Sequence, residues 1–219
     1  IEAGSRIVPT EDEDISSELM KVLTKKGITI YTNAKIDSES IEQTSTEVTV
    51  EVDIEGGVKA FTSEKLLLSV GRVANVKGIG IENTDILVEN GTIVVNNNLQ
   101  TAENHIYAIG DCIGGMQLAH VAAHEGIHAV EHIAGKAEAP IDYKKIARCI
   151  YSAPEVASVG ISEREATTQG IQVKVGQFPF KAIGKALVKG ETEGFVKIIA
   201  DSDTDDVIGV HMIGPNVTE

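Results

Sequence analysis

Residues 101–132 read TAENHIYAIGDCIGGMQLAHVAAHEGIHAVEH, and this stretch decides the fold. Residues 105–109 predict a short strand that leads directly into Gly110 and Asp111. A loop with two more glycines follows, and a helix is predicted from about Gln117. A strand, a glycine turn and a helix N-terminus in succession form a site for a phosphorylated ligand, because free backbone N–H groups and the positive end of the helix dipole face outward there. Asp111 could accept hydrogen bonds from a sugar or ribityl hydroxyl, so the stretch predicts a nucleotide or dinucleotide site.

The composition restricts the class of protein. The chain has 219 residues, 42% of them hydrophobic and 24% charged, which is enough for a real core in one large or two small domains. The formal net charge of −14 argues against nucleic acid as a partner, because its phosphates would be repelled. The sequence shows no apolar run of membrane-spanning length and no signal peptide, so we expect no membrane partner. Cys112 and Cys149 have no paired spacing, which makes a reducing cytoplasm the expected location.

A helix is predicted near the N-terminus. Thr10, with Glu13 three residues later, has the spacing of a capping box, and the acidic run 11–14 complements the helix dipole. Apolar residues at helical spacing follow from Ile15, and Gly27 ends the helix. The acidic run is therefore interpreted as a solvated first turn.

Strands are predicted on both sides of the central stretch, from apolar and β-branched runs bounded by turn residues. A hairpin should turn at Gly56 and Gly57, and Ser162 should cap a short helix that ends before Gly170. Residues 201–206, DSDTDD, look like the start of a calcium loop, but glycine at the sixth and glutamate at the twelfth position are missing, so a hairpin turn is predicted. The predicted strands are residues 28–31, 48–54, 58–61, 65–70, 93–95, 173–180, 194–200 and 207–213.

The central helix also contains a zinc-protease pattern. Residues 124–128 spell H-E-x-x-H, in which two histidines one turn apart would bind zinc and the glutamate would be the general base. His120, His124, His128 and His132 recur every fourth residue. A glycine interrupts the motif, and no further histidine or acid follows at the spacing that such proteases use. We therefore predict a histidine stripe without a zinc site, and a zinc hydrolase is kept as an alternative class of function.

The central stretch resembles the second FAD-binding motif of the flavoprotein disulfide reductases. The resemblance is carried by Tyr-Ala-Ile-Gly-Asp at 107–111, Gln-Leu-Ala-His at 117–120 and Glu-Gly at 125–126. The last two parts are most similar to the dihydrolipoamide dehydrogenases, the flavoproteins of 2-oxoacid dehydrogenase complexes, and the similarity covers essentially all 219 residues. It implies FAD as a cofactor, with Gly110 and Asp111 at the ribityl chain or pyrophosphate. It also implies contacts along the flavin from Gln117, Leu118, Ala119 and His120.

A second cofactor is indicated at the N-terminus. Glu2 is predicted to end a strand, where doubly wound folds place the acid that binds an adenosine ribose. An acid there favours the free 2′-hydroxyl of NAD over the 2′-phosphate of NADP, although Arg6 nearby acts in the opposite direction. Residues 1–16 resemble the second strand of the family's NAD domain, which implies that Glu2 binds the NAD ribose. The resemblance further implies that Gly71 approaches the dinucleotide and that Ile36 contacts adenine through its backbone.

The resemblance implies a fold of the α/β and α+β classes, with partial doubly wound nucleotide-binding domains followed by an antiparallel-sheet dimerisation domain. Residues 1–74 would be a partial NAD-binding domain, and residues 75–144 the returning part of the FAD-binding domain. Residues 145–219 would be a truncated dimerisation domain, which opens with the run 150–160.

The function that the resemblance implies is FAD-dependent transfer of electrons from protein-bound dihydrolipoamide to NAD. The enzyme would be a homodimer formed through the C-terminal domain, with lipoyl domains of 2-oxoacid dehydrogenase complexes as partners. The family's redox-active cysteine pair and its histidine–glutamate couple are not matched by Cys112, Cys149 or His211. We therefore expect a fragment of a longer enzyme, inactive by itself, with no catalytic and no metal-binding residue. Another disulfide reductase, such as a mercuric or glutathione reductase, and a non-catalytic dimerising module are the alternatives.

Overall fold

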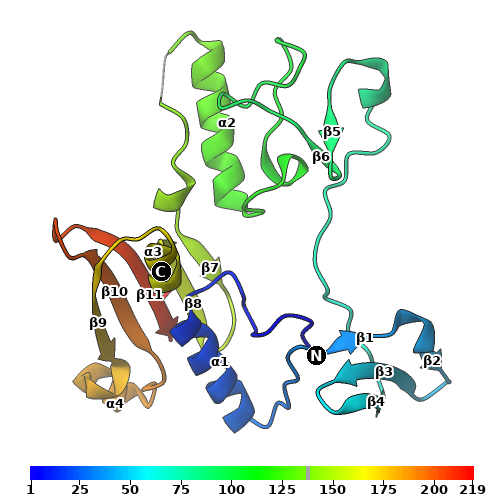
Figure 1. Cartoon of the computed structure of the whole chain (residues 1–219), viewed down its shortest axis with the longest axis vertical. Coiled ribbons are helices and arrows are strands. Elements are labelled where there is room, and N and C mark those ends of the chain that lie inside the picture. The colour runs from blue at the N-terminus through cyan, green and yellow to red at the C-terminus, as the bar shows by residue number, and fades with distance from the viewer. Residues whose placement is uncertain (137–138) are drawn as a thin grey trace. The chain divides into compact units, whose positions relative to one another are not determined.

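The computed structural model describes residues 1–136 and 139–219, which form two compact units. One unit consists of Ile1–Leu68 and Ala147–Glu219, and the other is Ser69–Ile146. Every strand pair that the structure describes is antiparallel, and the mixed α/β class with antiparallel sheets is confirmed (Figure 1). The three predicted domains are not tested by this division and stay predictions.

The first unit is built around a five-stranded antiparallel sheet (Figure 1). In spatial order its strands are β7 (Arg148–Ile150), β8 (Glu155–Gly160), β11 (Val207–Gly214), β10 (Phe195–Asp201) and β9 (Val173–Pro179). The three long strands predicted after residue 170 are thus confirmed, and Asp201 to Asp206 form the turn between β10 and β11. The helices of this unit are α1 (Glu13–Lys25), α3 (Glu163–Thr168) and α4 (Gly184–Lys189).

Helix α1 packs its apolar stripe on one face of this sheet. Ile15 and Leu19 form a buried cluster with Val156, Phe195 and Ile213 from β8, β10 and β11. Burial of each such side chain contributes roughly 1.5–3 kcal/mol. The helical spacing of apolar residues after Asp14 therefore has the predicted purpose, which is to bury one face of α1.

The start of α1 differs from the predicted capping box. The N-cap is Asp12, whose carboxylate accepts from the N–H of Asp14, at 3.0 Å from Oδ1 to N. Thr10 instead contacts the side chain of Glu11 through its hydroxyl. Aspartate caps a helix as well as threonine does, so the Thr10–Glu13 spacing alone did not fix the start. In α3 the predicted cap is confirmed, because Ser162 and Glu165 form a complete capping box.

The acidic run at the start of α1 is also not the solvated turn that was predicted. Glu11 and Asp12 are only 3% and 2% exposed. The carboxylate of Glu11 accepts from the hydroxyl of Ser158 and pairs with the guanidinium of Arg148. The first half of the run is therefore directed toward the sheet, where polar partners satisfy it.

A buried lysine joins α1 to the sheet and to α3. The Nζ of Lys197 in β10 lies 2.9 Å from Asp12, 2.7 Å from Asp14 and 2.8 Å from Glu163, measured to carboxylate oxygens, and its side chain is only 3% exposed. Burial alone would raise the pKa of Asp12, but the hydrogen bonds from Lys197 and from two backbone N–H groups outweigh it and lower that pKa. Burial alone would lower the pKa of Lys197, but hydrogen bonds to the three carboxylates raise it.

The first unit also contains a small four-stranded sheet. Its strands are β1 (Lys35–Ile36), β2 (Glu42–Gln43), β3 (Val48–Ile54) and β4 (Gly57–Ser63). The predicted hairpin is confirmed, since β3 pairs with β4 along its whole length across a turn at Glu55 and Gly56. Ala34, Val50 and Val52 form the buried centre of this part.

The second unit contains one long helix and a short hairpin (Figure 1). The helix is α2 (Ala119–Ile133), and the hairpin is formed by β5 (Val88–Glu89) and β6 (Thr92–Ile93). The helix begins two residues after the predicted Gln117, and only Ile93 of the strand predicted at 93–95 is part of a strand. The short 3-10 helices of the chain are η1 (Ser38–Ser40), η2 (Ile81–Asn83), η3 (Gly110–Ile113), η4 (Tyr143–Lys145) and η5 (Phe180–Ala182).

The strand predicted to end at Glu2 is wrong, because residues 1 and 2 belong to no strand. Three further predicted strands are also wrong. Residues 28–31 and 65–70 belong to no strand, and Ile28 and Leu67 are 49% and 88% exposed. Residues 105–109 make only a single bridge, between Tyr107 and Gln100. All three runs have apolar and β-branched residues, but a strand also needs a neighbour that pairs continuously with its backbone, and the described residues provide no such neighbour.

None of the helices that the structure describes is long and apolar enough to cross a membrane.

We expect Lys197→Met to lower the free energy of unfolding by roughly 3–5 kcal/mol, because it leaves the carboxylate of Asp12 buried without its cation. Urea titration followed by circular dichroism would measure the change. The matched control is Lys174→Met, which removes an exposed lysine paired with Asp205 and should change stability by less than about 1 kcal/mol. Equal effects of the two substitutions would contradict a structural role for the buried charge.

The lowered pKa of Asp12 also predicts a loss of stability in acid. Its ionised form is favoured in the folded state, so its contribution is complete above the ordinary aspartate pKa of about 4 and is lost as the pH falls below it. The raised pKa of Lys197 gives a contribution to stability that is complete below about pH 10.5 and is lost only as the pH rises above it, so Lys197 does not cause the change of stability in acid. We expect Asp12→Asn to flatten the decline of stability between about pH 5 and pH 2 relative to the unaltered chain. Parallel pH profiles for the two proteins would overturn this assignment.

Candidate functional site

The turn at Gly110 lies close against helix α2. Gly110 has φ of +74°, a conformation that favours glycine, and it begins η3, which contains Asp111. A Cβ atom at Gly110 would lie 3.2 Å from the Cβ of Ala122, so a side chain there would push the turn away from the helix. The predicted glycine turn is therefore present, although the run before it is not a strand.

The carboxylate of Asp111 is accessible beside this turn. Its side chain is 39% exposed, and it forms an ion pair with the guanidinium of Arg72. The carboxylate is thus available as an acceptor for hydroxyl groups of a ligand. Arg72 follows Gly71, which is exposed and has φ of +125°, and a Cβ atom at Gly71 would meet no neighbouring atom within 4 Å.

The N-terminus of α2 has no side-chain cap. Its N-cap is Leu118, which makes no capping hydrogen bond, and the first turn has no acidic residue. The helices α1 and α3, by contrast, are capped by Asp12 and Ser162 and begin with acidic residues. The positive end of the α2 dipole is therefore not balanced by a capping side chain from Leu118 or by an acid in the first turn, and such a helix start suits a ligand with negative charge.

The predicted flavin residues come together at this junction. Gly110 and Asp111 form the turn, and the four residues from 117 to 120 lead into and begin α2. Within that group Gln117 and Leu118 are half-buried, whereas Ala119 and His120 are exposed. The hydroxyl and phosphate groups of a dinucleotide fit this set of residues, because it offers a carboxylate acceptor, the positive end of a helix dipole and a close-packed glycine turn.

Two residues of this region were missed as site residues by the sequence reasoning. Glu125 is 2% exposed, and its Oε2 accepts from the N–H of Gly110 at 2.6 Å. Its Oε1 accepts from the hydroxyl of Tyr143 at 2.9 Å. Burial raises the pKa of Tyr143, and the hydrogen bond to Glu125 raises it further, to about 12. The Glu-Gly pair at 125–126 was visible in the sequence, but nothing in the sequence indicated Tyr143.

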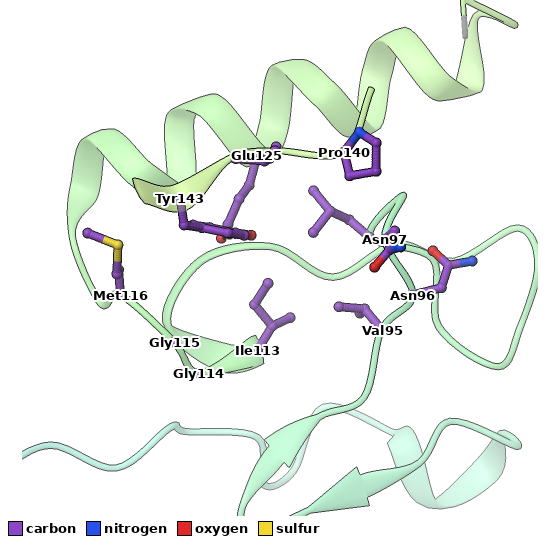
Figure 2. Close-up of a pocket in the computed structure, with 12 residues that line it drawn as sticks. Val95, Asn96, Asn97, Ile113, Gly114, Gly115, Met116, Glu125, Pro140 and Tyr143 are labelled. Atoms are coloured by element: carbon purple, nitrogen blue, oxygen red, sulfur yellow. Dashed lines mark hydrogen bonds between the residues drawn. The ribbon is translucent and has the colours of Figure 1, made fainter. Parts of the chain in front are cut away.

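A pocket of about 430 Å³ opens beside the same turn (Figure 2). Figure 2 shows Glu125 extending from α2 toward Tyr143, with Ile113 and Val95 on the walls. The loop Gly114, Gly115 and Met116 lines this pocket and leads to the residues predicted along the flavin, none of which belongs to the lining. The lining is completed by Asn96, Asn97, Leu99, Pro140 and Ile141.

The four histidines of α2 differ in their surroundings. Steps of four residues rotate by about 40° around a helix, so the stripe drifts from one face to another. His120 and His124 are exposed and His128 is buried, whereas Nδ1 of His132 lies 2.8 Å from the hydroxyl of Tyr107. Within residues 1–136 and 139–219, no three histidine, cysteine or acidic side chains are grouped so that they could hold a metal ion.

The predicted NAD residues are distributed over both units. Glu2 and Ile36 belong to the first unit and Gly71 to the second. The backbone of Glu2 bonds to Tyr31 and Ala34, and its Oε1 accepts from the N–H of Gly4 at 2.6 Å. Ile36 is half-buried in β1.

Arg6 is held in place by acceptors of its own chain. One guanidinium nitrogen donates to the carbonyl of Glu11 and the hydroxyl of Ser16, and the other donates to the carbonyl of Pro9. Arg6, which in the sequence spoke against a preference for NAD, therefore holds the segment before α1 through hydrogen bonds.

Both cysteines are free thiols. The Sγ of Cys112 donates to the carbonyl of Ile109 at 3.1 Å, and Cys149 lies in β7. His211 lies in β11, is fully buried and contacts the carbonyl of Ile161 through Nε2 at 3.0 Å. Cys112 and Cys149 are therefore not bonded to each other, and His211 is not exposed.

Comparison with protein families gives two matches. Residues 1–126 match the family described as pyridine nucleotide-disulphide oxidoreductase. Residues 146–219 match the pyridine nucleotide-disulphide oxidoreductase dimerisation domain.

Curated relatives are similar over the whole chain. A dihydrolipoyl dehydrogenase of Bacillus subtilis is 57% identical over 219 residues, which is 100% of this chain and 46% of that protein. A dihydrolipoyl dehydrogenase of Zymomonas mobilis is 39% identical over 223 residues, which covers 100% of this chain and 47% of that protein. The chain thus spans about half the length of the curated relatives it matches.

Solved structures share the fold. The crystal structure of LpdA from Mycobacterium tuberculosis matches with a TM-score of 0.87 and 28% identity, over 99% of this chain and 46% of that one. The HOCl-induced flavoprotein disulfide reductase RclA from Escherichia coli matches with a TM-score of 0.85 and 27% identity, over 99% of this chain and 49% of that one.

We expect no stoichiometric zinc in the protein after dialysis against a trace of the metal, because Glu125 is engaged by Gly110 and Tyr143 and the histidines diverge. Metal analysis of the unaltered protein, of His124→Ala and of His105→Ala would measure this. The last variant changes an exposed histidine outside α2 and controls for weak surface binding. One zinc per chain that disappears only in His124→Ala would contradict the absence of a metal site.

Proposed function

The chain belongs to the pyridine nucleotide-disulphide oxidoreductase family, and from that membership we propose that it is part of a dihydrolipoyl dehydrogenase. The observation that carries the proposal is the 57% identity to the Bacillus subtilis dihydrolipoyl dehydrogenase across all 219 residues. The structure supports it through the glycine turn, the Asp111 carboxylate and the uncapped start of α2. The activity is proposed for the whole protein that contains these residues.

FAD is the proposed cofactor of the second unit. Gly110 and Asp111 would lie at its ribityl chain or pyrophosphate, and Gln117 to His120 along the flavin. The positive end of the α2 dipole fits the phosphate oxygens of such a ligand, and the exposed carboxylate fits its hydroxyl groups. FAD, when bound, would supply the carrier that accepts two electrons from a dithiol and passes them to NAD.

NAD is the proposed second cofactor. The Glu2 carboxylate would accept hydrogen bonds from the ribose hydroxyls, and Ile36 and Gly71 would contact the dinucleotide through their backbone. The engagement of Arg6 by three acceptors supports NAD over NADP, because three of its N–H groups are already directed to atoms of its own chain and not to a 2′-phosphate.

The proposed reaction oxidises the two thiols of dihydrolipoamide to a disulfide and reduces NAD⁺ to NADH with release of one proton. This chain would bind and orient the cofactors, and none of its residues is proposed as catalytic. We propose a homodimer, supported by the dimerisation-domain match at residues 146–219, with lipoyl domains as partners and the cytoplasm as location. The two free thiols are consistent with a reducing compartment.

We expect Asp111→Ala, introduced into the whole natural protein, to weaken FAD binding by roughly 10–100-fold, since hydrogen bonds to a charged acceptor contribute about 1.5–3 kcal/mol. Titration of the apoprotein with FAD, followed by flavin fluorescence, measures the affinity, and NADH formation from dihydrolipoamide measures the activity. Asp85→Ala is the control, because it removes an exposed acid from the same unit.

The outcome also separates the alternatives. A protein that holds FAD but does not oxidise dihydrolipoamide with NAD would be a different disulfide reductase. A protein that binds neither FAD nor NAD would refute the proposed function and leave a dimerising module.

A further inference from the structure

Glu125 is a buried carboxylate for which the proposed reaction has no use. It lies in the middle of α2 with 2% exposure, and in the part of the chain that the structure describes it takes part in no ion pair. A carboxylate without a cation is costly to bury, and an apolar side chain would serve packing alone better. The two hydrogen bonds that it accepts therefore indicate a more specific purpose.

The first of these bonds fixes the turn that contains Asp111. The N–H of Gly110 donates to Oε2 of Glu125 at 2.6 Å, a short bond of the charge-assisted kind. Two close contacts hold the same turn against α2. Gly110 faces the Cβ of Ala122, and Gly126 leaves room for Ile109, whose Cδ1 would lie 3.3 Å from a Cβ at that glycine. The position of the Asp111 backbone relative to the start of α2 thus depends on one face of the helix.

The second bond orients the carboxylate itself. The hydroxyl of Tyr143 donates to Oε1 at 2.9 Å, and both belong to the second unit. The pKa of Tyr143, raised by burial and by this bond to about 12, keeps the hydroxyl protonated at neutral pH, so it remains a donor. With one oxygen held by Tyr143, the other accepts from the N–H of Gly110.

We propose that Glu125 is the positioning residue of the flavin site: through the N–H of Gly110 it sets the turn so that the Asp111 carboxylate and the positive end of the α2 dipole meet the same FAD molecule. Tyr143 positions Glu125 in turn. The inference rests on the proposed function, because it assumes that FAD is the ligand of Asp111.

The test compares variants of the whole natural protein. Glu125→Ala removes the acceptor and should weaken FAD binding by about 10-fold or more. Glu125→Gln keeps an oxygen for the N–H of Gly110 and can donate to Tyr143, so it should stay within about threefold of the unaltered affinity. Tyr143→Phe removes only the second donor and should lie between the two glutamate variants.

Two readouts separate positioning from general stability. Fluorescence titration gives the affinity for FAD, and hydrogen–deuterium exchange of the apoprotein reports on the backbone of residues 109–113. We expect faster exchange there in Glu125→Ala and near-normal exchange in Glu125→Gln. The matched control is Ala129→Gly, which weakens α2 at a buried position away from the turn and should leave both the exchange at residues 109–113 and the FAD affinity unchanged.

Several results would overturn the inference. FAD affinity in Glu125→Ala equal to that of the unaltered protein would do so, as would an equal loss in Ala129→Gly or no rescue by glutamine. If Glu125→Ala does not fold, an unchanged affinity in Tyr143→Phe decides against it. If the unaltered protein holds no FAD, the proposed function fails and this inference with it, whereas FAD binding that is insensitive to Glu125 overturns this inference alone.

Discussion

The first unit depends on one buried ammonium group. Lys197 is separated from Asp12 and Asp14 by 185 and 183 residues, yet its Nζ bonds to both and also to Glu163. Because an unpaired charge in that position would be very costly, the lysine and the carboxylates are compatible with burial only when all are in place. The packing of Ile15 and Leu19 stabilises the contact between α1 and the sheet. The pairs of Lys197 with Asp12 and Asp14 fix where along the sheet α1 packs.

The hydrogen bonds at the helix starts distinguish α2, which begins at the candidate cofactor site, from α1 and α3. In α1 and α3 the first N–H groups are satisfied by Asp12 and by the Ser162–Glu165 pair. In α2 the N-cap residue Leu118 makes no such side-chain bond, and Glu125 in the middle of the helix accepts from the N–H of Gly110 in the preceding turn. A helix N-terminus without a capping side chain, next to a turn that is held by a hydrogen bond, is suited to binding a negatively charged cofactor.

The parts of the fold that could be predicted from the sequence are those decided by local patterns. The β3–β4 hairpin, the cap at Ser162 and the strands after residue 170 follow from alternation, turn residues and spacing. The strand predictions were wrong for residues 28–31, 65–70 and 105–109, because a strand forms only where a neighbouring segment pairs with its backbone, and the residues of the strand do not show this. Asp12 was missed as a cap because Thr10 and Asp12 are equally good candidates two residues apart.

The candidate site shows the same division. Gly110, Asp111 and the residues from 117 to 120 could be chosen from sequence because they are contiguous in one motif. The role of Glu125 could not, since it depends on a hydrogen bond across 15 residues and on a tyrosine 18 residues away. The H-E-x-x-H pattern does not reveal that its glutamate, Glu125, is bonded to Gly110 and Tyr143, or that the described residues place no third ligand beside the histidines.

The division of the first unit into two segments has a consequence for synthesis. Helix α1 is made early, but the strands β8, β10 and β11 that cover its apolar stripe begin only at residue 155. During translation, therefore, the whole of the second unit leaves the ribosome while Ile15 and Leu19 still lack their partners. Contacts between segments so far apart in the chain close slowly. We expect the acidic first turn of α1, where Asp12 and Asp14 pair with Lys197 in the folded chain, to keep the helix hydrated during this interval and so to lessen its tendency to aggregate before the sheet forms.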